Sequence, residues 1–139
     1  MKLSTKTDYA ARAVLALARQ YGAGVAVPAV ELAREAQAPS SYLVQIMTDL
    51  RAQNIVKSQR GKSGGYQLAR PPSAISLADV VRGVRGSILD ISALSDSKCP
   101  VELRAAWKHL QKTIEREATR ITFQSLVDAQ SEKDRMFYI

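Results

Sequence analysis

The feature of this sequence that most restricts its fold is the stretch 55–69, where two short strand-like runs enclose a loop rich in glycine and basic residues. The runs are Ile55–Ser58 and Tyr66–Ala69, and the loop between them is Gln59–Gly65. Glycine adopts the positive φ values that tight turns need, so this stretch predicts a β-hairpin with a basic tip. Elsewhere the apolar residues recur at helical spacing. We therefore expect a mainly α-helical chain with one small β-hairpin.

Three helices are expected before the hairpin. The first spans residues 8–20, and the second begins near Pro28 and runs to about Gln37. Ser40 is predicted to be the N-cap of the third helix, because its hydroxyl can accept a hydrogen bond from an unpaired backbone N–H. The third helix carries one apolar stripe along its length, made of Leu43, Ile46, Met47 and Leu50.

Three further helices and one irregular segment follow the hairpin. Ser76 and Asp79 predict a capping box for a short fourth helix that ends near 83–86, and residues 87–99 show no regular pattern. Pro100 opens a long helix that reaches about Ala118, and a last helix begins at residues 121–122. We therefore divide the chain into residues 1–86 and residues 87–139. The apolar residues of the long helix recur at steps of 4, 3 and 4 and form a seam of Leu103, Trp107, Leu110 and Ile114.

The positive charge of the chain is concentrated in its first part. Residues 1–86 hold 12 Lys and Arg against 5 Asp and Glu, whereas residues 87–139 hold 8 of each kind. A cationic domain joined to a neutral one is typical of a module that binds a polyanion, followed by a module for assembly or sensing.

The composition excludes several classes of protein. At 139 residues the chain can bury a core without disulfides, and its single cysteine, Cys99, cannot form one within the chain. No apolar run approaches the ~18 residues that cross a bilayer. The N-terminus lacks the apolar stretch of a signal peptide, so we expect a cytoplasmic protein with no membrane partner.

Two helices joined by a tight turn and followed by a hairpin with a basic tip form the pattern of a winged helix-turn-helix. In such folds the second helix of the motif enters the major groove of duplex DNA. The outer face of the third predicted helix carries Ser41, Gln45, Thr48 and Ala52, which suit close approach to base edges. Gln45 is either a reader of adenine or an ordinary exposed glutamine, and Tyr42 packs either along the DNA backbone or in the core.

Further DNA contacts are expected at the start of the third helix, at the hairpin tip and before the first helix. These candidates are Ser40 and Ser41, Arg60 and Lys62, and Lys2, Ser4, Thr5 and Lys6. A glycine-rich basic loop also suggests a nucleotide site. However, the phosphate-loop pattern is absent and this loop leads into a strand, so we do not expect nucleotide binding.

Two other classes of function, an enzyme and an interaction protein, are alternatives to DNA binding. The sequence shows no nucleophile–base pair, acid pair or metal-ligand cluster, and its only histidine, His109, reads as a surface residue, so we do not expect an enzyme. An interaction protein that regulates a metabolic enzyme by binding it through the neutral second part stays an alternative.

Several separate motifs then occur in one order along the chain. They are the opening Met1–Ala10, the segment Ser41–Gln45 with Leu50 and Arg51, the hairpin Val56–Leu68, the segment Ile75–Val80, the Trp107 helix and the ending Ile121–Phe123. Together they resemble the family of dimeric winged-helix bacterial transcription regulators that includes IscR, NsrR and CymR. The resemblance covers nearly the whole chain.

This resemblance implies a homodimer joined by the long helix and bound to pseudo-palindromic promoter sites, and we predict a repressor. It assigns DNA contacts to the matching serines, Tyr42, Gln45 and Arg60. The remaining motif residues assigned to the DNA surface are Arg51, Ser58, Gly61, Gly64, Gly65 and Tyr66.

The chain departs from this family in the cysteines of the sensor segment and in one helix position. Cluster-binding members hold iron and sulfur with three cysteines before the long helix, whereas this chain has only Cys99 there. Asp8 occupies the place of an acidic ligand in some members, but one Cys and one Asp make a poor site. We therefore predict no metal and no cofactor. Val44 stands where many members have Glu, which would alter base preference.

Without a cluster, the signal has two possible sources. Cys99 precedes Pro100 at a helix N-terminus near Lys98, and both the helix dipole and the lysine favour the reactive thiolate. Cys99 is therefore a candidate redox sensor, and the alternative is an inert cysteine. A small-molecule effector is the other possible source of the signal.

Overall fold

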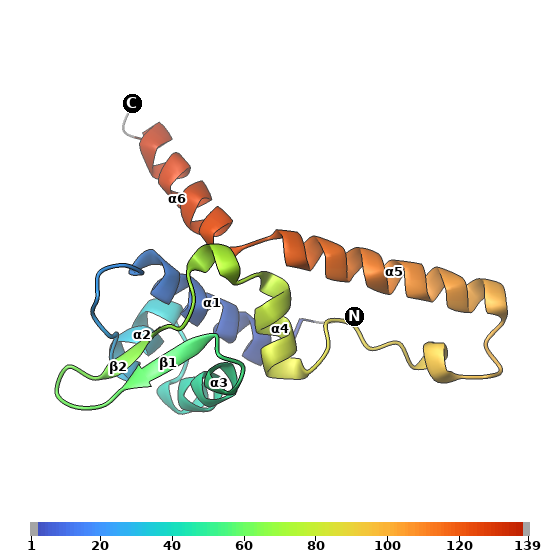
Figure 1. Ribbon diagram of the computed structural model, residues 1–139, viewed down its shortest axis with the longest axis horizontal. Coiled ribbons are helices and arrows are strands. Elements are labelled where there is room, and N and C mark those ends of the chain that lie inside the picture. The colour runs from blue at the N-terminus through green and yellow to red at the C-terminus, as the bar shows by residue number, and fades with distance from the viewer. Residues whose placement is uncertain (1–2, 138–139) are drawn as a thin grey trace.

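The computed structural model describes the backbone of residues 3–137 and the side chains of residues 3–133 (Figure 1). Lys2, predicted to contact DNA, lies outside the described residues. The elements in order are α1 (Thr5–Arg19), α2 (Ala29–Ala36), α3 (Ser40–Ala52), β1 (Val56–Gln59), β2 (Gly65–Leu68), η1 (Pro72–Ala74), α4 (Leu77–Arg85), η2 (Ser92–Ser95), α5 (Val101–Arg120) and α6 (Phe123–Phe137). The predicted mainly helical chain with one hairpin is confirmed. None of the described helices is both long and apolar enough to cross a membrane.

Helix α1 begins three residues earlier than predicted. Ser4 is its N-cap, and the Ser4 hydroxyl accepts a hydrogen bond from the backbone N–H of Thr7 at 3.1 Å. The two hydroxyls of Ser4 and Thr7 also lie 2.7 Å apart. The apolar pattern starts only at Tyr9, so hydrophobic spacing missed the first turn, which polar capping stabilises.

The predicted cap of α3 was wrong by one residue. The N-cap is Pro39, whose carbonyl accepts from the backbone N–H of Leu43 at 3.0 Å, and Ser40 is the first residue of the helix. No side chain caps this end. Pro39 holds the extended φ and ψ that an N-cap requires without using its side chain, so the hydroxyl of Ser40 stays free for solvent or a ligand.

The cap of α4 is confirmed. The hydroxyl of Ser76 accepts from the backbone N–H of Asp79 at 3.1 Å, and the Asp79 carboxylate accepts from the backbone N–H of Ser76 at 2.9 Å. The helix ends before Gly86, whose φ of +86° is the conformation glycine adopts most readily.

The hairpin is joined to the helical part through a third extended segment. Strands β1 and β2 pair antiparallel, with Val56 opposite Leu68 and Ser58 opposite Tyr66. On the other edge of β2, Val27 and Tyr66 exchange backbone hydrogen bonds of 2.9 and 2.8 Å. A Cβ at Gly65 would collide with the backbone carbonyl of Val27, so this close approach requires glycine.

The core lies among α1, α2, α3, α4 and the hairpin, and it extends past residue 86. Phe123, at the start of α6, has 0% exposure and belongs to the same hydrophobic cluster as the first helices. Its backbone N–H donates to the carbonyl of Ile75 at 2.9 Å, and the N–H of Leu77 donates to the carbonyl of Ile121 at 2.9 Å. The division at residue 86 stays a prediction; the structure adds that α6 is anchored in the first part.

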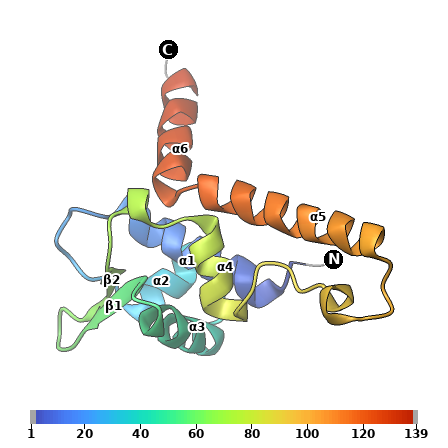
Figure 2. The same ribbon diagram turned by 45° about the vertical axis from the view of Figure 1, so that its right-hand side comes forward.

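Helix α5 projects from this body. The chain leaves α4 through residues 87–99, moves away from the other helices, and returns along α5 to α6 (Figures 1 and 2). Helix α5 runs two residues beyond the predicted end and has 20 residues, none of them buried. Gln111 ties it to the linker by donating to the carbonyl of Leu89 at 2.9 Å.

We predict that Phe123→Ala strongly destabilises the fold. Removing a fully buried phenyl ring leaves a cavity in the shared core, and such changes cost about 3–5 kcal/mol of the free energy of unfolding. Urea denaturation followed by circular dichroism measures this loss. The exposed control Val30→Ala should change stability by less than about 0.5 kcal/mol. Equal effects of the two substitutions would contradict the anchoring role of Phe123.

Candidate nucleic-acid interface

Helix α3 divides into a buried face and an exposed face. Leu43, Ile46, Met47 and Leu50 are fully buried, as the stripe predicted. The opposite face exposes Ser41, Gln45 and Thr48, and Val44 lies among them with 51% of its surface exposed. The hydroxyl of Thr48 donates to the carbonyl of Val44 at 2.9 Å, so its proton is already engaged. The free surface of this face therefore combines an amide, serine hydroxyls and an isopropyl group.

Helices α2 and α3 form the helix-turn-helix. Gln37 ends α2 in the left-handed conformation with φ of +52°, and the backbone N–H of Ala38 bonds to the carbonyl of Ala33 at 3.0 Å. Pro39 follows at once and starts α3. This short turn places α3 against α2 and beside the hairpin (Figure 1).

The Tyr42 ring packs against α1. This environment differs from both predictions for Tyr42, which placed it along the DNA backbone or in the core. Its ring meets the Tyr9 ring edge-on, with centroids 5.7 Å apart, and 44% of the residue is exposed. The guanidinium of Arg12 lies 5.6 Å from the Tyr9 ring centre and pairs with the Asp8 carboxylate at 2.8 Å. This chain of contacts orients the Tyr42 phenol at the start of α3. Asp8, considered earlier as a possible ligand, is occupied by Arg12.

Lys6 is brought to the same face by an ion pair with α3. Its ammonium lies 2.8 Å from the Asp49 carboxylate, and both side chains are about one-third exposed. Lys6, Tyr42 and Gln45 line a shallow depression of about 240 Å³. Of the other N-terminal candidates, Thr5 is exposed, whereas the Ser4 hydroxyl is used in capping α1. The predicted contribution of the N-terminus therefore centres on Lys6.

The hairpin tip presents its basic residues to solvent. Arg60, Gly61 and Lys62 are exposed, and neither cation forms an ion pair with any residue that the structure describes. Gly61 has φ of +107°, and its carbonyl accepts from the backbone N–H of Gly64 at 3.0 Å. Gly64 and Gly65, assigned to the DNA surface from motif matches, thus shape the turn and the root of the hairpin.

Arg51 connects α3 to the hairpin. Its guanidinium donates to the hydroxyl of Ser58 on β1 at 3.0 Å, and both residues are exposed. Tyr66 is half-buried and packs against the core beside them. These three residues, assigned to the DNA surface from motif matches, therefore also fix how the hairpin sits on α3.

The sequence reasoning missed the partners that position these groups. Asp49 holds Lys6, and Tyr9 with Arg12 holds Tyr42. Asp49 lies one helical turn after Gln45, so its place on the same side of α3 was available from spacing. The contact between Tyr9 and Tyr42 joins two helices far apart in sequence, which spacing alone does not reveal.

The second part of the chain contains the candidate seam and the cysteine. Leu103, Trp107 and Leu110 are exposed and Ile114 is half-buried, all on α5. Cys99 is a half-buried free thiol directly before α5, and its sulfur lies 3.6 Å from the carbonyl oxygen of Pro100. His109 is exposed on α5, as its surface reading predicted.

Comparisons with known proteins place this arrangement in a family. The HTH-type transcriptional regulator CymR of Bacillus subtilis is 32% identical over 142 residues, which cover 100% of each chain. The solved structure of CymR, described as the global cysteine regulator of B. subtilis, has a TM-score of 0.82 at 28% identity and covers 93% of this chain and 98% of its own. The structure of T. potens IscR has a TM-score of 0.78 at 30% identity, covering 96% and 90%.

Residues 3–129 match the Rrf2 family, which is described as an iron-dependent transcriptional regulator. The predicted resemblance, the winged helix-turn-helix fold and the prediction of a DNA-binding transcription regulator are confirmed by these matches. The chain belongs to the Rrf2 family of transcriptional regulators.

Proposed function

We propose that this regulator is a homodimeric repressor that binds a pseudo-palindromic promoter site in the cytoplasm. The observation that carries the proposal is the exposed polar face of α3, with Lys6 beside it and the exposed cations Arg60 and Lys62 at the tip of the adjoining hairpin, where neither pairs with a described residue. A face of this kind matches a major groove flanked by two phosphate backbones. A protein lying on a promoter blocks access to it, which favours repression.

Sequence readout is assigned to the middle of α3. The amide of Gln45 has the geometry for bidentate hydrogen bonds to adenine, and the N-terminal turn with Ser40 and Ser41 suits phosphate. The isopropyl group of Val44 lies one residue away and is exposed, so it is placed to contact the methyl group of a thymine. The hairpin tip, through Arg60 and Lys62, is assigned to phosphates or the minor groove.

Dimerisation is assigned to α5. Its apolar residues Leu103, Trp107 and Leu110 lie on one side of a helix with no buried residue, and Lys108 and Lys112 lie on the opposite side. An isolated helix with an uncovered apolar side gains stability by burying that side. A second copy supplies the same apolar side around a twofold axis, which matches a pseudo-palindromic site.

The iron dependence in the family description does not fit the donors of this chain. Among the described residues, no three of His, Cys, Asp and Glu lie together as metal ligands. Cys99 is the only cysteine, Asp8 pairs with Arg12, and iron–sulfur clusters need several thiolate or imidazole ligands. The proposed function therefore uses no metal or cofactor. Sensing by Cys99, a partner enzyme and the absence of enzymatic activity stay predictions.

We predict that Arg60→Ala/Lys62→Ala weakens DNA binding and flattens its salt dependence. Each lost phosphate contact lowers the slope of log K against log salt by about 0.9, so the double variant should lose roughly 2. Fluorescence anisotropy with promoter DNA at several salt concentrations measures this slope. The control Lys108→Ala/Lys112→Ala removes the same charge from the outer side of α5 and should keep the full slope. If both variants keep the wild-type slope, the hairpin tip does not contact phosphate.

We predict that Val44 reads the methyl group of thymine. Replacing the contacted thymine by deoxyuridine removes that methyl and should weaken binding by the wild-type protein about fourfold, from about 0.8 kcal/mol per buried carbon group. Val44→Ala should bind both DNAs equally, whereas Gln45→Ala should keep the preference for thymine. Anisotropy titrations of the three proteins against each singly substituted operator test this. The assignment fails if Val44→Ala stays as sensitive to deoxyuridine as the wild type.

We predict that Leu110→Glu converts the dimer to a monomer. Leu110 lies in the α5 seam with 43% of its surface exposed, and a carboxylate there would be buried without a partner in the dimer. Light scattering coupled to size exclusion should then give the mass of one chain, with the helical circular dichroism signal preserved. Lys108→Glu, on the opposite side of α5, should remain dimeric. A dimeric Leu110→Glu protein would place the dimer interface elsewhere.

A further inference from the structure

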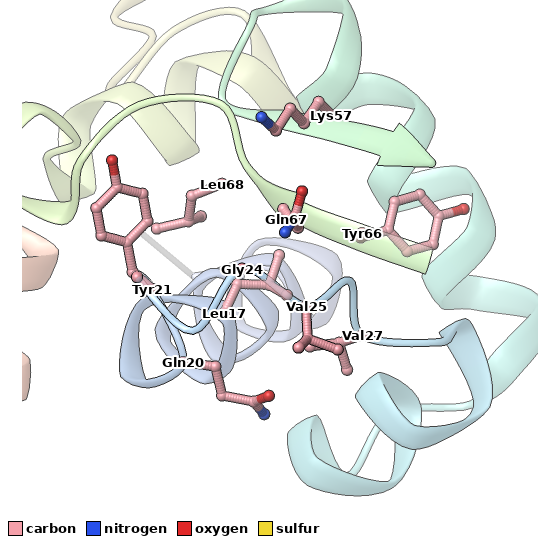
Figure 3. Close-up of a pocket in the computed structure, with 11 residues that line it drawn as sticks. Leu17, Gln20, Tyr21, Gly24, Val25, Val27, Lys57, Tyr66, Gln67 and Leu68 are labelled. Carbon is pink, nitrogen blue, oxygen red and sulfur yellow. The ribbon is translucent and has the colours of Figure 1, made fainter. Parts of the chain in front are cut away.

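A cavity of about 270 Å³ lies between β2, the C-terminal end of α1 and the loop that follows α1 (Figure 3). Leu68 and Gln67 line it from β2, Leu17 lines it from α1, and Val25 lines it from the loop. Its volume lies just below the roughly 300–1,000 Å³ of most small-molecule pockets, so it suits a ligand of amino-acid size. This cavity is separate from the exposed face of α3.

Two backbone groups of Leu68 have no partner at this cavity. Tyr66, opposite Ser58, exchanges both of its backbone hydrogen bonds with Val27 and not with β1, so Ser58 and Tyr66 form a non-hydrogen-bonded pair of the β1–β2 ladder. Hydrogen-bonded and non-hydrogen-bonded pairs alternate in an antiparallel ladder. Leu68, opposite Val56, therefore turns its N–H and carbonyl away from β1, toward the edge where Val27 pairs with Tyr66. Among the described residues, no hydrogen bond reaches either group of Leu68.

This position differs from an ordinary exposed strand edge. Leu68 is only 4% exposed, and buried backbone N–H and carbonyl groups nearly always have hydrogen-bond partners. The loop before Val27 would supply the missing strand residue, but its pairing with β2 stops at the bridge of Val27 with Tyr66. A molecule with one N–H and one carboxyl oxygen, spaced as in an amino acid, satisfies both groups of Leu68.

The residues that line the cavity indicate which other chemical groups a ligand would carry. Lys57 is its only charged residue, forms no ion pair with any described residue, and so favours a carboxylate. The side chains of Leu17, Val25 and Val27 provide apolar surface for a short hydrocarbon group. With no carboxylate in the lining, a ligand nitrogen is matched by the carbonyl of Leu68.

We propose that this cavity binds a small apolar L-amino acid, free or N-acylated, which occupies the strand position opposite Leu68. The ligand N–H donates to the Leu68 carbonyl, and its carboxylate accepts from the Leu68 N–H and from the Lys57 ammonium. The aliphatic side chain packs on Leu17 and Val25.

A ligand here acts on the hairpin. The cavity adjoins the bridge of Val27 with Tyr66, and Val27 leads directly into α2 of the helix-turn-helix. A ligand that extends this bridge by one residue joins the end of α1 to the root of the hairpin and so changes the position of its basic tip. This regulatory consequence rests on the proposed function, whereas ligand binding itself does not.

The test is an NMR titration of the full chain without DNA. The probes are L-valine, N-acetyl-L-valine and N-acetyl-D-valine, and the backbone amides of Gly24, Val25 and Leu68 report binding. We expect saturable shifts of these amides with the L probes and much weaker ones with the D probe, and the tighter L probe shows whether the nitrogen is an amine or an amide. Shifts that do not saturate with either L probe, or equal binding of both enantiomers, would overturn the proposal.

Three variants locate the binding. Val25→Phe fills the cavity from an exposed position and should lower probe affinity more than tenfold while the amide spectrum stays that of a folded chain. Lys57→Gln removes the cation and should weaken binding about two- to fivefold, as expected for an exposed charge pair. Lys62→Gln removes the same charge at the hairpin tip and should bind normally. Unchanged affinity in Val25→Phe would place the probe outside this cavity.

Discussion

The architecture depends on the attachment of the start of α6 to the first part of the chain. The segment around Ser76 pairs with the segment around Thr122, and this pairing inserts Phe123 into the core formed by the first four helices. The bonds of Ile75 with Phe123 and of Ile121 with Leu77 fix the start of α6 and, just before it, the end of α5. Because α5 has no buried residue, its direction relative to the DNA-reading face is set by this attachment at its C-terminal end together with its contacts to α4 and the bond of Gln111 to the Leu89 carbonyl.

Much of the fold was predictable because local patterns agree with the final packing. The apolar stripe of α3, the capping box of Ser76 and Asp79, and the glycine-rich tip each encode their structure over a few residues. Helix ends were less accurate where polar capping by Ser4 or the backbone of Pro39 decided them, since hydrophobic spacing carries no information on these bonds. Phe123 reaches the core through contacts with residues far away in the sequence. The residues around it have the pattern of an ordinary helix start, so its burial was not predicted.

The candidate DNA-binding site was also predictable only where local sequence patterns determine it. Which side chains are exposed on α3 followed from helical periodicity, and the basic character of the tip followed from composition. The contacts that hold these groups in place could not be predicted from local sequence, because Asp49, Tyr9 and Ser58 bind residues of other elements. The Tyr42 ring illustrates this point: both sequence alternatives assumed one environment, whereas the ring rests on Tyr9 and keeps nearly half of its surface exposed.

The contact of Gly65 with the Val27 backbone separates two parts of the hairpin that differ in their freedom to evolve. At the root, any side chain on residue 65 would push β2 away from the segment that leads into α2, so a change there disturbs the helix-turn-helix itself. At the tip, the side chains of Arg60, Lys62 and Ser63 are exposed, whereas Gly61, with φ of +107°, holds the turn and favours glycine. Single substitutions at these three exposed positions can therefore alter the charge of the tip while the scaffold is preserved, so this part of the protein can acquire new DNA preferences without loss of stability.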